Sequence, residues 1–358
     1  MHVRLQRVER FHASWGRPLR CTIGGMKDQT ATFGDVQTAA RVIRRHLSPA
    51  PLIRSYPLED ALGIHSTRRV WIKDYGYTPV GSFKLMGALN WVECNLEAIG
   101  DRPIAAHSSG NFASGLSFAG RQYGKRVIIV MPETAPRVKF ALTRSFGAEI
   151  RTYDIATDHQ TGVRDRLTRE IAEKENGLQA SPYDDKHVIA GNGVGGLEIV
   201  QALQGMGRGI SHFVCQVSGG GLMAGHALAI KQGFPKARIW GVEPDTAADF
   251  AESLKKGQRT RIDHPTGICD GLLSYDVGEY NWPILKNMVD EAVPIPDEST
   301  RDAMRWLFEK HGLRVEPSGA IGVAALLTGK SRLDGDGDIV VVVSGRNVDD
   351  HQFLEWVQ

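Results

Sequence analysis

The chain lacks the cysteine pattern of a zinc-binding or disulfide-rich protein. Its 358 residues hold only four cysteines, Cys21, Cys94, Cys215 and Cys269, and none forms a C-x-x-C pair. Cysteines this far apart favour free thiols in a reducing compartment. Long apolar runs are also missing, since none approaches the roughly 20 residues that span a bilayer. The charged N-terminal stretch MHVRLQRVERFHASWGR has no signal-peptide core. We therefore expect a cytoplasmic protein without a membrane partner.

An excess of charge of either sign is missing too. Lys and Arg number 43 and Asp and Glu 41, so the formal net charge is only +2. This balance gives no electrostatic reason to expect nucleic acid as a partner. Apolar residues make up 42% of the chain, which is enough to bury a sizeable core. The length suits two domains or one large α/β unit.

Short β-branched runs alternate with helix-period segments along most of the chain. This alternation predicts parallel sheets with helices on both faces, because the strands are continuous apolar runs such as RVIIVMP and DIVVVVSG. The predicted strands are 70–73, 104–106, 127–131, 149–153, 212–217, 238–242 and 339–343, and the predicted helices lie near 84–98, 111–123, 136–146, 160–175, 192–205, 222–232 and 317–328. Residues 1–50 are less regular and are predicted to form an N-terminal arm or an oligomer contact.

A glycine-rich loop, SGGGLMAG from Ser218 to Gly225, follows one predicted strand and opens a helix. Consecutive glycines let backbone N–H groups approach an anion, and the helix N-terminus favours negative charge. The loop therefore predicts a phosphate site. A dinucleotide site is the alternative, because Glu243 ends the next strand about twenty residues further on. The glycine spacing, G-x-G-x-x-x-G, departs from the dinucleotide pattern.

A second loop, HSSGNFASGL from His107 to Leu116, lies between a predicted strand and a predicted helix. Hydroxyl groups and unpaired N–H groups at a helix start are suited to binding a carboxylate. An ordinary helix N-cap would need only one such residue, whereas this loop has three and a glycine. We therefore predict that it binds a carboxylate.

Lys84 is the only charged residue in VGSFKLMGA, from Val80 to Ala88. Either it reaches from a helix start into water, or desolvation lowers its pKa and exposes a nucleophilic amine, as a Schiff-base lysine requires. Ser344 presents a hydroxyl at the end of the last predicted strand. An imine-forming lysine, a phosphate loop, a carboxylate loop and this hydroxyl share one economical ligand, pyridoxal phosphate carrying an amino acid. An uncharged hydroxyl at the pyridine nitrogen favours β-elimination over transamination.

The stretch GVEPDTAADF raises the question of a metal site. Glu243 ends a predicted strand and Asp249 follows six residues later. Two carboxylates and an intervening carbonyl can hold a hard divalent cation. A solvated helix cap is the alternative reading.

The chain resembles the serine/threonine dehydratase family of fold type II pyridoxal phosphate enzymes, which includes serine racemase. The resemblance runs from about Pro51 to Asp349 and rests on an ordered set of motifs: GSFKLMGA, SSGNFASGLSFAGRQYGKRVIIVMPETAPRVK, VIAGNGVGGLEI, SGGGLMAG, GVEP, DGL, EPSGA and SGRNVD. It implies a fold like the tryptophan synthase β subunit, with two α/β domains, mainly parallel sheets and the cofactor in the cleft between them. The large domain would comprise 51–104 and 183–358, and the small mobile domain 105–182.

The resemblance also implies roles for individual residues. Lys84 would form the Schiff base, Ser109 would act as a second catalytic group, and Glu243, Ala247 and Asp249 would hold magnesium, calcium or manganese. The implied cofactor contacts are Phe83, Lys84, Asn111, Ser218, Gly219, Gly220, Gly221, Leu222, Gly271, Glu316 and Ser344, and the implied substrate contacts are Ser108, Ser109, Gly110, Asn111 and Phe112.

The function implied is an ammonia-lyase that converts a β-hydroxy amino acid, such as serine, threonine or 3-hydroxyaspartate, to a 2-oxo acid and ammonia. Lys84 would take the α-proton. Racemisation, with Ser109 reprotonating the opposite face, is an alternative on the same scaffold, and a nicotinamide-dependent oxidoreductase is a distant one. A homodimer is expected.

Three features depart from the family pattern. Phe112 stands where many relatives have histidine, and DYGYTPVGSFK is unusual before the lysine. Arg346 replaces the second glycine of the usual SGGN, which is expected to bring a cation close to Ser344.

Overall fold

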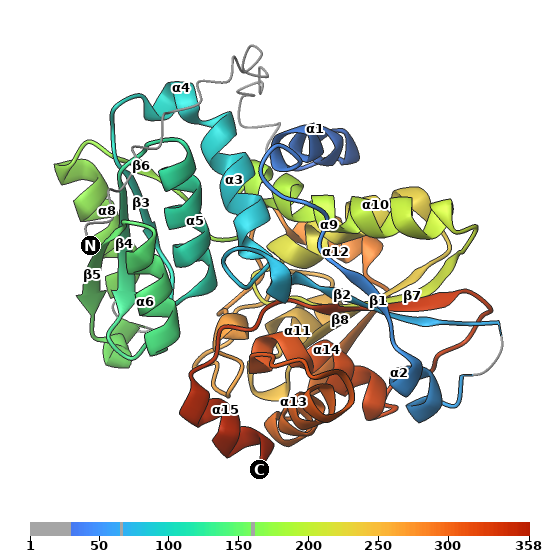
Figure 1. Cartoon of the computed structure of the whole chain (residues 1–358). Helices are drawn as coiled ribbons and strands as arrows, with labels where there is room; N and C mark the ends of the chain where they lie inside the picture. The colour runs from blue at the N-terminus through green and yellow to red at the C-terminus, as the bar shows by residue number, and fades with distance from the viewer. Residues whose placement is uncertain (1–29, 65–66, 159–161) are drawn as a thin grey trace, which may run out of the picture.

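The computed structural model describes residues 30–64, 67–158 and 162–358, and their strands form two separate sheets (Figure 1). The larger sheet has six strands in the order β1-β2-β10-β7-β8-β9, and the smaller has four in the order β5-β4-β3-β6. All neighbouring strands are parallel except β1 and β2. The prediction of an α/β protein with mainly parallel sheets is confirmed.

The larger sheet is covered on both faces. Its strands are β1 (Leu52–Arg54), β2 (Val70–Asp74), β7 (Ile210–Gln216), β8 (Arg238–Pro244), β9 (Glu291–Ile295) and β10 (Asp338–Val343). In β10, Val340 and Val342 belong to one hydrophobic cluster, whereas Ile339 and Val341 belong to another. Because both faces of this strand are buried, its sequence is continuously apolar instead of alternating.

Two groups of helices provide these clusters. One face is covered by α1 (Phe33–Ile43), α9 (Lys186–Gly205), α10 (Gly221–Gly233) and α12 (Trp282–Met288), and the other by α2 (Tyr56–Ala61), α13 (Asp297–His311), α14 (Pro317–Leu327) and α15 (Asp350–Val357). Helix α11 (Asp249–Lys256) contacts β9. Gly193 and Gly225 let α9 and α10 approach closely, since a Cβ on either glycine would overlap the backbone of the other helix.

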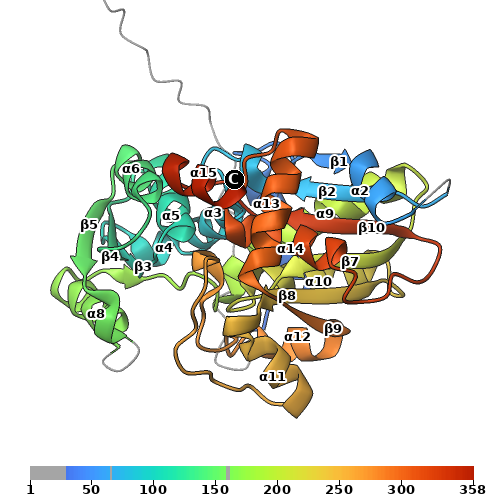
Figure 2. The same ribbon diagram turned by 90° about the horizontal axis from the view of Figure 1, so that it is seen from below.

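The smaller sheet is built from β3 (Ile104–His107), β4 (Val127–Pro132), β5 (Glu149–Tyr153) and β6 (Leu178–Gln179). Helices α5 (Asn111–Gln122) and α8 (Val163–Lys174) both contact β3 and β4, and Figures 1 and 2 show them on opposite faces of the sheet. Helix α6 (Arg137–Ser145) packs on α5. The segments of this sheet fall within 104–179, while the limits of a mobile small domain at 105–182 remain a prediction.

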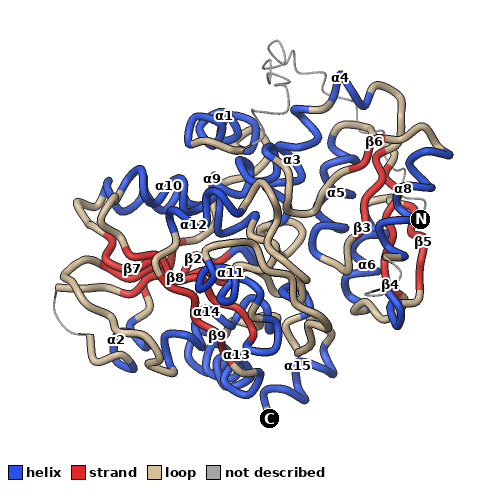
Figure 3. Tube along the Cα trace, turned by 180° about the vertical axis from the view of Figure 1, so that it is seen from behind, coloured by secondary structure: helices blue, strands red, loops and turns tan. Residues whose placement is uncertain are grey.

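Helix α3 (Lys84–Cys94) joins the two parts of the molecule, because it packs on α9 of one and on α5 of the other. The short α4 (Leu96–Ile99) continues it towards the smaller sheet. Figure 3 shows the strands of the two sheets at opposite sides of the molecule, with helices and loops between them. Lys84 is the first residue of α3, so it lies where the two parts meet.

The structure corrects two expectations. Residues 33–43 form α1, whose Val36, Ala39 and Ile43 are buried in the main core, so this part of 1–50 is not an arm, and residues 1–29 lie outside the described residues. A capping box between Thr32 and Asp35 begins the helix. Cys94 is disulfide-bonded, which corrects the expectation of four free thiols, because cysteines distant in sequence can meet in a folded chain. Cys215 and Cys269 are free and buried.

Among the described residues, no helix has the length and apolar character needed to cross a membrane.

Candidate active site

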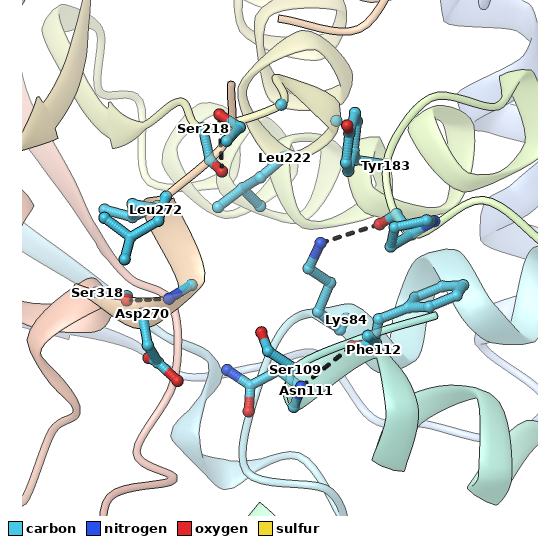
Figure 4. A pocket seen from close by; sticks show the side chains of 18 of the residues that line it. Lys84, Ser109, Asn111, Phe112, Tyr183, Ser218, Leu222, Asp270, Leu272 and Ser318 are labelled. Atoms are coloured by element: carbon cyan, nitrogen blue, oxygen red, sulfur yellow. Dashed lines mark hydrogen bonds between the residues drawn. The ribbon is translucent and has the colours of Figure 1, made fainter. Parts of the chain in front are cut away.

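A pocket lies between the two parts of the molecule, at the carboxyl ends of several strands, where ligands gather in open α/β sheets. Figure 4 shows Lys84 between the loop that carries Ser109 and Asn111 and the loop that carries Ser218. The residues named from the sequence that line this pocket are Phe83, Lys84, Ser108, Ser109, Gly110, Asn111, Phe112, Ser218, Gly219, Gly220, Gly221, Leu222, Gly271 and Ser344. Fourteen of the predicted positions, from Phe83 to Ser344, thus meet in one place.

Lys84 reaches into the pocket from the first turn of α3. Its Nζ donates a hydrogen bond to the carbonyl of Pro182 at 2.9 Å. Nζ also lies 5.2 Å from the ring centroid of Phe83 and 6.0 Å from that of Phe112. Burial lowers the pKa of Lys84 from 10.5 to about 8. This environment matches the desolvated lysine of the sequence prediction and not one that extends into bulk water.

The segment before Lys84 is fixed to the end of the last strand. Phe83 donates its N–H to the carbonyl of Ser344 at 3.0 Å, and Ser82 and Gly345 form an antiparallel bridge. The Ser344 hydroxyl donates to the carbonyl of Ser318 at 3.2 Å. The lysine and the strand-end hydroxyl, 260 residues apart in the chain, are therefore held in a fixed relation.

The glycine loop opens α10 in a conformation that few side chains would allow. Ser218 and Gly220 have positive φ values of 52° and 97°. A Cβ on Gly219 would overlap the ring of Tyr183, which lies against the loop. Asn281 holds the loop from behind by donating its amide to the carbonyl of Gly219 at 2.9 Å. The first N–H groups of a helix have no partner within it, so this end of α10 offers donors to an anion.

The loop from Ser108 to Asn111 opens α5. The Ser108 hydroxyl accepts the N–H groups of Gly110 at 3.1 Å and Ala113 at 3.2 Å. The Asn111 amide donates to Glu316 at 2.6 Å, and its carbonyl accepts from Asn347 at 2.8 Å. Glu316 does not line the pocket and lies one layer behind it, in contact with Asn111.

Gly271 lies on the large-sheet side of the pocket. Its N–H donates to the hydroxyl of Ser318 at 3.0 Å, and a Cβ on Gly271 would come within 3.1 Å of that hydroxyl. A side chain at this position would therefore crowd the pocket wall.

Several pocket residues were not among the site residues predicted from the sequence. Arg164 comes from α8, Tyr183 from the segment before α9, Lys139 from α6, His107 from the end of β3, and Asp270 from a short helix. Lys139 and Asp270 stand inside the quoted PRVK and DGL motifs, so those motifs offered a signal that was not used. Arg164 lies outside every quoted motif.

Arg164, in α8, contributes a positive charge to the pocket from the side of the smaller sheet. Its Nε lies 3.5 Å from Asp158 and 3.6 Å from Asp165 and makes no hydrogen bond within the described part of the chain. Its guanidinium lies 5.2 Å from the ring centroid of Tyr275. Asp165 is shared with His107, whose Nε2 lies 3.0 Å away. The hydrogen bond from His107 is the main reason that the pKa of Asp165 falls to about 2.

The predicted metal ligands, Glu243, Ala247 and Asp249, do not line the pocket. Glu243 and Asp249 are fully buried. Glu243 accepts the N–H groups of Phe250 at 3.2 Å and Ala251 at 2.7 Å, so it does cap α11, but not in solvent. Burial, and for Glu243 also the nearby charge of Asp249, raises the pKa of both carboxyls, that of Asp249 to about 8. Asp249 Oδ2 has no hydrogen-bond partner among the described residues.

Arg346 does not approach Ser344 as expected. Its Nε donates to the carbonyl of Gly76, and its guanidinium lies 4.7 Å from the ring centroid of Tyr77. The two unusual features of the sequence, Arg346 and the DYGYTP segment, therefore contact each other outside the pocket. Phe112 is buried in the pocket wall, so the wall is apolar there.

Comparison with known proteins agrees with this site. A family model described as pyridoxal-phosphate dependent enzyme matches residues 43–345. The L-threo-3-hydroxyaspartate ammonia-lyase of Saccharomyces cerevisiae is 33% identical over 318 residues, which is 89% of this chain and 94% of the relative. The serine racemase of Schizosaccharomyces pombe is 31% identical over 326 residues, covering 91% and 97%.

Among solved structures, a pyridoxal 5'-phosphate-dependent aspartate racemase superimposes with a TM-score of 0.84 at 26% identity, over 90% of this chain and 98% of that one. The match favours pyridoxal phosphate over the nicotinamide alternative for the glycine loop. The chain belongs to the family of pyridoxal-phosphate dependent enzymes of fold type II, together with ammonia-lyases, threonine dehydratases and serine racemases.

Proposed function

We propose that this enzyme is an ammonia-lyase for a β-hydroxy amino acid with a second carboxylate, such as 3-hydroxyaspartate. The observation that carries the proposal is the guanidinium of Arg164 in the pocket wall. The similarity to the L-threo-3-hydroxyaspartate ammonia-lyase of yeast supports the same proposal.

The pocket fits pyridoxal phosphate on its own features. The glycine loop lines the pocket, and a Cβ on Gly219 or Gly221 would overlap Tyr183, so only glycine lets the loop backbone and Tyr183 pack together here. Lys84, with its pKa lowered to about 8, supplies an amine for the aldehyde. Asn111 and Ser344 offer polar groups for the two sides of the ring. When bound, the cofactor supplies an electron-accepting ring that stabilises negative charge at the substrate α-carbon.

Lys84 is proposed as the base that takes the α-proton. With a pKa of about 8, a substantial fraction of the amine is neutral near neutral pH, which suits a general base. The N–H groups at the start of α5 and the hydroxyls of Ser108 and Ser109 are proposed to bind the α-carboxylate. Loss of the β-hydroxyl then completes the elimination, and the 2-oxo acid and ammonia follow by hydrolysis.

Arg164 is proposed to bind the second carboxylate of the substrate. Its distances to Asp158 and Asp165 are 3.5 and 3.6 Å, longer than good charge-assisted hydrogen bonds, so donors remain for a ligand. A planar guanidinium is matched to a carboxylate. The side chains of serine and threonine offer no negative charge to it.

Racemisation stays the second candidate. Ser109 lines the pocket on the loop opposite the phosphate loop (Figure 4), where a hydroxyl is suited to return a proton to the α-carbon. Two of the compared proteins are racemases by name.

The proposal is tested by assaying the wild-type enzyme and the Arg164→Gln variant with a panel of amino acids. For each amino acid, the formation of a 2-oxo acid and of the opposite enantiomer is measured. Loss of a hydrogen-bonded ion pair costs about 1.5–3 kcal/mol, so kcat/KM for 3-hydroxyaspartate should fall by about 10- to 150-fold. The value for serine should change by less than about threefold.

Arg261→Gln is the matched control. Arg261 lies 4.5 Å from the centroid of the same Tyr275 ring but does not line the pocket, so this variant should leave both substrates unaffected. A wild-type enzyme that prefers serine over 3-hydroxyaspartate, or an Arg164→Gln variant that loses both substrates equally, would contradict the proposal.

We also propose a divalent cation at Glu243, Asp249 and the carbonyl of Ala247. The unpartnered Asp249 oxygen supports it, as does the cost of burying two adjacent carboxyls without a cation. No group of three His, Cys, Asp or Glu side chains suited to a metal occurs in the described ranges, so the carbonyl and water would complete the oxygen ligands. A cytoplasmic homodimer remains our proposal for location and assembly, from the family resemblance.

A further inference from the structure

A buried ion cluster joins the two walls of the pocket. Lys139, on α6 beside the smaller sheet, places its Nζ 2.6 Å from Asp270 and 3.0 Å from Glu316. Both carboxylates belong to the large-sheet side, Asp270 in a short helix at Asp270–Leu272 and Glu316 at the N-cap of α14. The side chains of Lys139 and Glu316 are 2% and 1% exposed. Burial lowers the pKa of Lys139, but the two carboxylates outweigh it and hold the pKa above its usual range.

The stem of Lys139 packs against the loop that we propose to bind the substrate α-carboxylate. A Cβ on Gly110 would overlap Cδ of Lys139. The lysine stem thus occupies the space that a side chain at position 110 would need. The position of the Lys139 stem therefore determines how closely the 108–111 loop packs against α6.

Glu316 extends the cluster to Asn111. Its Oε1 accepts from the Asn111 amide at 2.6 Å, while its Oε2 contacts Lys139. Asn347 donates to the other side of Asn111 at 2.8 Å. The last residue of the 108–111 loop is consequently held by the same carboxylate that holds Lys139.

We propose that Lys139 is a positioning residue that fixes the 108–111 loop and the Asn111 side chain against the large-sheet side, and thereby sets the affinity for the substrate carboxylate. The inference rests on the proposed role of that loop. Without the ammonium, the buried Glu316 carboxylate loses its counter-charge and the loop loses its support at Gly110 from a fixed stem. The reacting groups themselves, Lys84 above all, are not touched by Lys139.

Lys139→Met tests the proposal in the holoenzyme, because methionine keeps an apolar stem and removes the ammonium. KM for the amino acid turned over should rise at least tenfold, with kcat changed less than threefold. Hydrogen exchange of the backbone amides at 108–113, measured without substrate, should become faster. Asp270→Asn is the milder variant, and it should shift both quantities in the same direction by a smaller amount.

Asp349→Asn is the matched control. Asp349 also ties α6 to the large-sheet side, since it accepts the N–H groups of Arg137 at 2.9 Å and Val138 at 2.8 Å, but it does not reach the loop. This variant should lower the melting temperature and leave KM and the exchange at 108–113 unchanged.

The double variant Lys139→Met, Glu316→Gln separates positioning from stability. Lys139→Met leaves the buried Glu316 carboxylate without a counter-charge, so this single variant should have a lower melting temperature than the wild type. Neutralising Glu316 in the double variant removes that charge, so the melting temperature should recover while KM stays raised. The proposal is overturned if KM recovers together with the melting temperature, or if Lys139→Met leaves either KM or the exchange unchanged. Hydrogen exchange is measured without turnover, so it reports on the mobility of the 108–113 backbone even if the proposed elimination reaction is wrong.

Discussion

The strongest quantitative prediction concerns the proton affinity of Lys84 in the protein freed of pyridoxal phosphate. Its pKa is lowered from 10.5 to about 8 by burial. At pH 7.5 an amine with a pKa of about 8 is roughly one-quarter neutral, whereas one with a pKa of 10.5 is about 0.1% neutral. Lys84 should therefore react with an amine-directed reagent far faster than a surface lysine at this pH.

The same shift predicts how stability depends on pH. The unfolded lysine keeps its proton up to pH 10.5 and the folded one loses it near pH 8, so between these values the unfolded state binds more protons and stability rises with pH. Below pH 8 the folded state carries the cost of a desolvated ammonium. A pKa difference of 2.5 corresponds to about 3 kcal/mol, and because Lys84 is only partly buried, screening by solvent is expected to reduce this to about 1–3 kcal/mol.

Lys84→Met is the variant that measures it. Without the cofactor it should be more stable than the wild type by about 1–3 kcal/mol at pH 7, and the difference should shrink steadily as the pH rises through 8 towards 10.5. Urea unfolding at pH 7, 8.5 and 10, together with mass-spectrometric labelling of Lys84, makes the measurement. Lys174, exposed on the smaller-sheet side, is the labelling control.

Two results would refute the reasoning. One is a stability difference between Lys84→Met and the wild type that stays constant from pH 7 to pH 10. The other is a labelling midpoint for Lys84 as high as that for Lys174. Either would mean that the amine is well solvated and that the structure gives no lowered pKa for catalysis.

Three further predictions concern the rest of the site. Ser109→Ala should remove any racemisation while sparing much of the elimination, and deuterium incorporated from solvent into both enantiomers of recovered substrate at an unchanged rate would argue against a proton-donating serine. Gly219→Ala should weaken pyridoxal phosphate binding at least tenfold, because the new Cβ would overlap the Tyr183 ring; cofactor titration followed by visible absorption checks this, and wild-type affinity would disprove a tightly fitted loop. Chelation should lower activity and melting temperature together, with magnesium or calcium restoring both, and Asp249→Ala should reproduce the chelated state without responding to added metal; a protein with no bound divalent ion and no response to chelator would leave Glu243 as a buried cap of α11.

The parts of the fold that the sequence predicted are those with a local cause. Runs such as Val127–Pro132 and Asp338–Val343 are buried along their whole length, and a strand covered on both faces must be apolar throughout. The short strands were missed for the opposite reason. β6 has only two residues, Leu178 and Gln179, and exists because β3 offers an edge to pair with, which no pattern in two residues can indicate.

The loops that carry the proposed chemistry were predictable because their composition is unusual in itself. Three consecutive glycines before a helix, or two serines, a glycine and an asparagine at a helix start, indicate anion binding at whatever place the fold puts them. The sequence did not determine that α1 would pack into the core, because residues 33–43 acquire their partners from α3, α9 and α10.

Only the tertiary structure decided which charges face the pocket. Arg164 and Lys139 lie in helices α8 and α6. Nothing near Arg164 in the sequence distinguishes it from the other arginines of the chain, and the motif that ends at Lys139 does not say which groups its ammonium contacts. Arg164 became a candidate for substrate recognition because α8 places it in the pocket wall. Lys139 became a positioning residue because it pairs with Asp270 and Glu316, which lie more than a hundred residues away in the chain. Arg346, which looked close to the site in sequence, contacts Gly76 and Tyr77 instead. A short sequence motif specifies backbone shape, whereas the direction and partners of a long charged side chain depend on contacts between segments that are distant in the chain.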